Sequence, residues 1–165
     1  MGEEVTNSKL GFISFEPSSQ TFRGFLSIHT ALEGDSDPEA LARDAAAVYQ
    51  LLVGHMRSAV GGIDALRRTH TPVPARAVWQ LGDLIFRLTR ELADLHLQLD
   101  GVYEHLTREL GVKRKWLEKV IILRRYIDDV SVIPESLNWG RLEKGTARRA
   151  RELARARASN GEPWT

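Results

Sequence analysis

The feature that most constrains the fold is a regular apolar repeat in the middle of the chain. Between residues 78 and 106, an apolar side chain recurs alternately after three and after four positions. This spacing predicts an amphipathic helix whose apolar stripe must be covered by a facing helix, either from the same chain as an antiparallel hairpin or from a second subunit. The candidate oligomer or partner seam consists of Val78, Leu81, Ile85, Leu88, Leu92, Leu95 and Leu99, and the same register continues to Val102 and Leu106.

Another helix is predicted immediately before this repeat. Residues 37–39 read Asp-Pro-Glu, which is typical of a helix start because Asp caps free N–H groups and Pro fits the first helical position. Apolar residues then recur every three or four positions over residues 41–60. The two prolines within residues 69–74 end this helix, and Asp-Gly at residues 100–101 is expected to bend the next helix without changing its buried face.

The expected fold class is therefore mainly α, a long antiparallel helical hairpin or bundle with a helix-turn-helix-like C-terminal part. Residues 1–36 are expected to form an arm or a short β-hairpin, because two aromatic runs (residues 11–15 and 21–28) flank a Pro-Ser-Ser-Gln turn signal. The helical domain is predicted over residues 37–145, followed by a basic C-terminal helix and tail over residues 146–165.

The composition excludes several classes of protein. The 165 residues include no Cys, which excludes a disulfide scaffold, a thiolate zinc site and a cysteine nucleophile. No apolar window reaches the roughly 18 residues that a membrane-spanning helix needs, and the acidic N-terminus lacks the pattern of a signal peptide. We therefore expect a cytoplasmic protein that does not interact with a membrane.

Charge is distributed unevenly along the chain. Residues 1–50 carry 3 basic and 8 acidic side chains, whereas residues 106–165 carry 14 basic and 8 acidic side chains. This asymmetry favours an anionic partner, such as nucleic acid or the acidic face of a protein. The alternative is that the basic side chains are interspersed with acidic ones on solvated helix faces.

Residues 106–120 resemble a helix-turn-helix. Gly111 suits a left-handed turn, and Leu117 and Val120 are spaced to pack the second helix onto the first. In such motifs the second helix enters the DNA major groove, where basic side chains contact phosphates and Arg114 would read guanine. The alternative is a plain corner of a helical bundle. The candidate nucleic-acid-binding residues are Lys113, Arg114, Lys115, Lys119, Arg124, Arg125, Arg141, Arg148, Arg149 and Arg151.

Four segments between residues 76 and 154 carry a family resemblance. They are Trp-x-x-Gly-x-x-Ile at residues 79–85, Leu-Thr-Arg-Glu-Leu at 106–110, a basic helix over 111–126 and Leu-Asn-Trp-Gly at 137–140. Their order is similar to that in the helical N-terminal domain of a bacterial family of PD-(D/E)XK-type nucleases.

This sequence departs from the pattern of that family at three places. Thr107 and Gly140 stand where the family has Ser, and Arg125-Tyr126 stands where it has Phe-Tyr. The resemblance implies a DNA-associated helical module in a restriction, defence or mobile-element system. It implies no catalytic residue, because the nuclease half of the family has no counterpart here.

The residue patterns of common enzyme sites are absent from the sequence. The five His residues show neither the spacing of a helical zinc site nor a His-Glu-x-x-His motif. There is no Gly-rich phosphate loop followed by Lys-Ser/Thr and no Gly-x-Ser-x-Gly elbow. We therefore expect a protein that is not an enzyme, with no metal, no cofactor and no small-molecule substrate.

Two functions fit these observations. The first is a non-enzymatic, nucleic-acid-associated helical protein, a DNA-binding accessory module of a bacterial defence, restriction or mobile-element system. The second is a protein–protein adaptor or assembly subunit that binds through the leucine seam and the N-terminal aromatic arm. Both functions predict a homo-oligomer or a subunit of a larger complex.

Overall fold

The computed structural model describes residues 14–16, 21–23, 26–28, 38–95, 97–99 and 102–160, and these residues are mainly helical, as predicted. The helices are α2 (Pro38–Arg68), α3 (Ala75–Asp94), α4 (Val102–Leu110), α5 (Arg114–Tyr126), the short 3-10 helix η1 (Val130–Val132), α6 (Gly140–Glu143) and α7 (Thr146–Asn160). The strands are β1 (Ser14–Glu16), β2 (Thr21–Arg23), β3 (Leu26–Ile28) and β4 (Leu97–Leu99).

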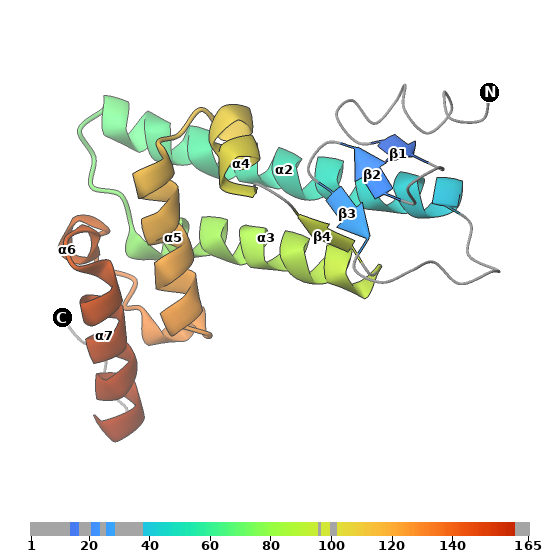
Figure 1. Cartoon of the computed structure of the whole chain (residues 1–165). Helices are drawn as coiled ribbons and strands as arrows, with labels where there is room; N and C mark the ends of the chain where they lie inside the picture. The colour runs from blue at the N-terminus through green and yellow to red at the C-terminus, as the bar shows by residue number, and fades with distance from the viewer. Residues whose placement is uncertain are drawn as a thin grey trace.

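The two long helices α2 and α3 lie side by side as an antiparallel hairpin (Figure 1). Helix α2 begins and ends close to the predicted residues, and α3 begins directly after the predicted loop. The repeat on α3 is covered by apolar residues of α2, such as Leu52 and Met56, and by other helices of the same chain. Five of the predicted seam residues are 3% exposed or less, namely Val78, Leu81, Ile85, Leu88 and Leu92. They form the core of one chain, so they are not available as a seam for a second subunit.

The apolar repeat does not continue as one helix to residue 106, and this part of the prediction is wrong. Helix α3 ends at Asp94, and the Leu95 N–H is bonded 3.0 Å from the Leu92 carbonyl oxygen. Leu99 belongs to β4, which pairs antiparallel with β3 so that Leu26 lies opposite Leu99. In a continuous helix, the backbone N–H and C=O groups of residues 97–99 would bond to other residues of that helix. Here these residues pair with β3 instead. Leu99 therefore lies outside the helical stripe.

Strands also occur where the N-terminal arm was expected. β1 and β2 pair antiparallel, and Phe15 lies opposite Phe22. This pairing agrees with the short hairpin predicted from the two aromatic runs. β3 follows β2 closely in the sequence and pairs with β4. This pairing connects the N-terminal arm to the segment that follows α3.

A second layer of helices crosses the hairpin. Figure 1 shows α5 lying across α3 and α4 lying against α2, with α7 beside α5. Leu106 of α4, Leu117 of α5 and Leu153 of α7 are all fully buried and belong to the same core as the hairpin. Because α7 shares this core, the predicted boundary at residue 146 does not separate two cores among the described residues.

The helix termini have simple local causes. Thr146 is 5% exposed and donates its hydroxyl to the Glu143 carbonyl oxygen at 3.0 Å, which fixes the start of α7. Pro74 precedes α3 with extended backbone angles, as expected for a residue that cannot donate a backbone hydrogen bond. Within the described ranges, no helix combines the length and the apolarity that crossing a lipid bilayer requires.

Candidate nucleic-acid interface

The corner between α4 and α5 is a tight glycine turn between two helices, at the position that the sequence predicted. Gly111 has φ +65°, a left-handed conformation that favours glycine. The Val112 N–H then donates to the Thr107 carbonyl oxygen at 3.2 Å, and Lys113 is extended before α5 begins. The side chains that hold the corner together are Leu106, Leu110, Leu117 and Val120, all of them buried.

Helix α5 presents one open stripe to solvent. It packs against α3, α4 and α7, which cover its Leu117, Val120 and Leu123. The remaining face carries residues spaced four, three and four apart, the interval at which helical side chains lie above one another. These residues are Lys115, Lys119, Ile122 and Tyr126, of which Lys115 and Tyr126 are exposed and the other two are half-buried.

Arg114 is held by two carboxylates at the start of α5. Its Nη1 lies 2.7 Å from Glu104 Oε1 of α4, and its Nε lies 3.2 Å from Glu118 Oε1 one turn further along α5. The guanidinium also lies 5.6 Å from the centre of the Tyr103 ring. These contacts tie α4 to α5 and occupy the groups with which Arg114 was predicted to read a guanine.

Arg124 was also predicted to bind nucleic acid, but the structure places it in a contact between two helices. Its side chain is only 15% exposed, and its Nε lies 2.9 Å from Asp83 Oδ1 of α3. Its guanidinium lies over two aromatic rings of α3, 5.1 Å from the centre of Trp79 and 4.7 Å from that of Phe86. Arg124 therefore joins α5 to α3, because a cation on this side of α5 meets the polar and aromatic groups of the crossing helix.

The arginines of α7 divide between its open and its packed face. Arg151 is exposed and lies 5.3 Å from the centre of the Tyr126 ring, which places α7 beside the end of the α5 stripe. Arg148 lies on the same side, three residues earlier, and its Nη1 is 3.3 Å from Glu152 Oε1. Arg149 is half-buried and donates a hydrogen bond to the Arg141 carbonyl oxygen, so it belongs to the packed side.

The structure thus brings part of the predicted set together on one surface. The open stripe of α5 is about 16 Å long from Lys115 to Tyr126, at 1.5 Å per helical residue. The exposed side of α7 continues it through the contact between Tyr126 and Arg151. We call this surface the basic strip, and it consists of Lys115, Lys119 and Tyr126 on α5 with Arg148, Arg151 and Arg155 on α7.

Besides Arg114, Arg124 and Arg149, three further predicted residues lie outside the basic strip. Lys113 lines a cleft at the turn together with Trp116 and the acidic side chains Asp64 and Glu143. Arg125 is exposed but lines a different cleft, between α5 and α3. Arg141 is exposed on α6.

Sequence reasoning left Tyr126 and Arg155 out of the candidate set. Tyr126 is 38% exposed, one of the most exposed large apolar side chains among the described residues. Its spacing of seven residues from Lys119 was a usable signal, because that interval returns to the same side of a helix. Arg155 follows Arg148 by the same interval.

The residues that carry the family resemblance have clear packing roles. The Trp79 Nε1–H donates to the Ile127 carbonyl oxygen at 2.7 Å. A Cβ built on Gly82 would lie 2.9 Å from the Val120 carbonyl oxygen, so a glycine is needed where α3 and α5 touch. Trp139 is 3% exposed, and its backbone N–H donates to the Val73 carbonyl oxygen just before α3.

The titratable groups whose pKa values are clearly shifted also have structural causes. Burial raises the pKa of Tyr49, and the nearby charge of Glu109 adds to this effect. Burial lowers the pKa of His105 on α4. The N–H of Ser131 lowers the pKa of Asp129, which caps η1. Each shift follows from packing or capping, so none of them by itself indicates a catalytic group.

Metal sites and similar proteins give no further indication of function. Within the described part of the chain, no group of three or more His, Asp or Glu side chains is placed to hold a metal ion. No protein-family model, no curated protein and no solved structure matches this chain. The chemistry of the basic strip is therefore the starting point for a functional hypothesis.

Proposed function

We propose that this protein is a non-enzymatic helical module that binds nucleic acid through the basic strip. The observation that carries the proposal is the contact between Arg151 and Tyr126, which joins the cations of α5 and α7 into one exposed surface. Lysine and arginine side chains on such a surface contact backbone phosphates and release the counterions that surround nucleic acid. The exposed ring of Tyr126 adds an apolar contact between the two groups of cations.

The proposed binding does not depend on the base sequence of the nucleic acid. Base reading by a helix-turn-helix needs side chains at the start of the second helix that are available to the major groove. Here Arg114 is bonded to Glu104 and Glu118, so the strongest candidate for a guanine contact is engaged within the protein. The cations of the basic strip suit phosphates instead, which position a protein on nucleic acid without reading its sequence.

The resemblance to the nuclease family supports a biological setting for this activity. We propose that the module acts as a DNA-binding accessory part of a bacterial defence, restriction or mobile-element system in the cytoplasm. The segments that carry the resemblance build the contact between α3 and α5, as the positions of Trp79 and Gly82 illustrate. That contact holds α5 with its open stripe facing outward.

The alternative adaptor function has less support. It relied on the leucine seam and on the N-terminal aromatic arm. The side chains of the arm lie outside the described part of the chain, and seam side chains such as Leu88 and Leu92 are fully buried within one chain. A surface that is already used for the core cannot bind a partner without unfolding the protein. The remaining large apolar side chain that is well exposed among the described residues is Leu51, which is isolated on α2.

A salt titration with a matched charge control tests the proposal. Arg148 pairs with Glu152, so the other four cations of the basic strip predict that log Kd for duplex DNA changes with log salt concentration with a slope of about 3.6. The double substitution Lys115→Glu and Lys119→Glu should weaken binding at least about tenfold and lower the slope by about 2. The control, Arg68→Glu with Arg87→Glu, makes the same change in net charge at exposed positions on α2 and α3.

The control should retain most of the affinity, and both double variants should unfold at the temperature of the wild type. Fluorescence anisotropy with a labelled duplex gives the affinities, and circular dichroism gives the unfolding temperatures. Equal losses in the two double variants would show that binding depends only on net charge and would refute the assignment of the basic strip.

A further inference from the structure

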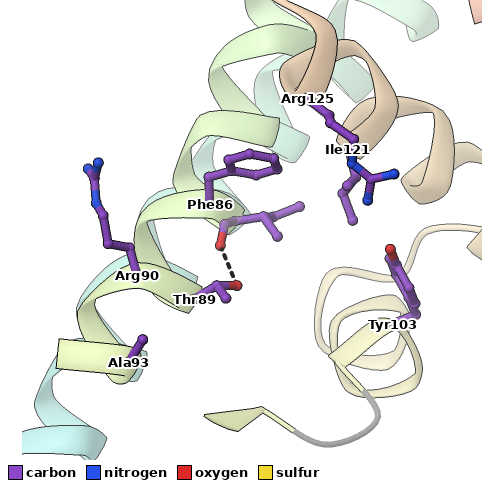
Figure 2. Close-up of a pocket in the computed structure, with 8 residues that line it drawn as sticks. Phe86, Thr89, Arg90, Ala93, Tyr103, Ile121 and Arg125 are labelled. Carbon is purple, nitrogen blue, oxygen red and sulfur yellow. Dashed lines mark hydrogen bonds between the residues drawn. The ribbon is translucent and has the colours of Figure 1, made fainter. Parts of the chain in front are cut away.

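A cleft of about 400 Å³ lies between α3, α4 and α5, and its lining includes Arg125, which precedes Tyr126 of the basic strip in the sequence. Figure 2 shows Phe86 and Ala93 of α3 on one side, with Tyr103 of α4 and Ile121 of α5 on the other. Its volume is within the usual range for sites that hold small organic groups. The proposed phosphate contacts of the basic strip do not involve this cleft.

The cleft combines aromatic walls with one inward-facing cation. Figure 2 shows the guanidinium of Arg125 extending toward Ile121 and Tyr103, while Arg90 points away from the interior. The Thr89 hydroxyl donates to the Ile85 carbonyl oxygen at 3.1 Å, so it is engaged within α3. None of the described side chains that line the cleft is acidic.

Both aromatic walls are held in place by contacts from outside the cleft. The guanidinium of Arg124 lies 4.7 Å from the centre of the Phe86 ring, and that of Arg114 lies 5.6 Å from the centre of the Tyr103 ring. Neither arginine lines the cleft. A flat ring that enters it therefore meets aromatic groups whose positions are already set, which reduces the entropy lost on binding.

We propose that this cleft takes the base of an unpaired nucleotide in a strand bound along the basic strip, with Arg125 contacting the phosphate. This inference rests on the proposed function. Arg125 and Tyr126 are neighbours at the end of α5, and the first lines the cleft while the second belongs to the basic strip. A strand that follows the strip therefore passes close to the mouth of the cleft.

Charge complementarity selects a nucleotide over an apolar peptide side chain. An apolar group would cover Arg125 without supplying an anion, and removing a cation from water without a partner is costly. A nucleotide supplies a flat base for Phe86 and Tyr103 and a phosphate for the guanidinium. Stacking on aromatic side chains together with cationic contacts to the backbone is the usual way in which proteins bind single strands.

Photocrosslinking provides the test. A single-stranded oligonucleotide with one 5-iododeoxyuridine should crosslink to the wild type, and mass spectrometry should map the crosslink to Phe86 or Tyr103. Ala93→Trp fills the cleft from an exposed position on α3, and its control, Ala47→Trp, adds the same bulk to an exposed position on α2. Arg125→Gln is a second variant that changes no packed side chain.

We expect Ala93→Trp and Arg125→Gln to abolish the mapped crosslink and to lower the affinity for the single strand at least about fivefold, as loss of one stacked base does. Ala47→Trp should leave the crosslink and the affinity unchanged, and the affinity for a fully paired duplex should change less than twofold in Ala93→Trp.

Several results would overturn the inference. If both cleft variants crosslink and bind as the wild type does, while Lys115→Glu with Lys119→Glu still abolishes binding, the cleft assignment is wrong and the proposed function stands. Equally efficient crosslinking of free 5-iododeoxyuridine monophosphate would overturn the assignment to a bound strand. If the wild type binds neither the oligonucleotide nor the duplex, the proposed function fails as well.

Discussion

Arginine residues on two neighbouring helices, α5 and α7, have opposite roles. Arg124 is 15% exposed and is bonded to Asp83, whereas Arg151 is exposed and lies over the ring of Tyr126. The difference comes from the opposing element. Helix α3 presents a carboxylate and aromatic rings to Arg124, and no described helix covers the outer side of Arg151.

Replacing Arg124 should destabilise the fold more than replacing an exposed arginine. Arg124→Ala leaves the partly buried carboxylate of Asp83 without its 2.9 Å partner, so we expect a loss of about 2 kcal/mol or more in the free energy of unfolding. Arg148→Ala removes an exposed pair with Glu152 and should cost less than about 1 kcal/mol. Urea denaturation measures both values, and a smaller loss for Arg124→Ala than for Arg148→Ala would contradict the assigned roles.

The candidate surface could be predicted only in part at this scale. The spacing of Lys115 and Lys119 places them on one side of a helix, and both do belong to one stripe. The pairing of Arg114 with Glu104 spans ten residues and a turn, so no rule for neighbours within one helix reveals it. Which cationic side chains remain exposed depends on how the helices cross. That crossing is set by contacts between residues that are far apart in the sequence.

Among the elements, the helices were predictable and the break after α3 was not. Long stripes of apolar residues spaced by three and four identify α2, α3 and α5, because only a helix brings such positions together. Residues 95, 97 and 99 are all Leu, so this segment also alternates with the period of a strand. Pairing with β3, which is distant in the sequence, decides between the two.

The crossing of α3 and α5 depends on the absence of a side chain at Gly82. An added Cβ would lie 2.8 Å from Arg124 Cβ and 2.9 Å from the Val120 carbonyl oxygen, so the helices would have to separate. We expect Gly82→Ala to lower the free energy of unfolding by about 1–3 kcal/mol, even though Ala favours helix formation.

The matched control for this substitution is Gly54→Ala on α2. A Cβ at Gly54 meets no atom within 4 Å, so only the helix propensity changes and stability should rise by about 0.5–1 kcal/mol. Thermal unfolding followed by circular dichroism compares the two variants. A rise in unfolding temperature for both would show that the close approach of α3 and α5 is absent in solution.

At the scale of the whole molecule, one chain satisfies the requirement that its apolar repeat be covered. Helix α2 covers one side of α3, and α5 crosses it to close the core. The sequence predicted the need for a facing helix but left open which chain supplies it, because heptad spacing is the same in both cases. The buried state of Leu88 within a single chain decides this point.

This arrangement predicts how a seam substitution affects stability. Leu88→Ala creates a cavity inside one chain and should lower the free energy of unfolding by about 2–5 kcal/mol. The loss should be the same at every protein concentration, because stability depends on concentration only where an interaction joins separate chains. Leu51→Ala, at a position that is 61% exposed, is the control and should change stability by less than about 0.5 kcal/mol. Thermal unfolding over a hundredfold range of protein concentration measures these effects. If the loss caused by Leu88→Ala shrank as the protein was diluted, the seam would have to lie between chains, and the α2–α3 hairpin would not be the unit that buries it.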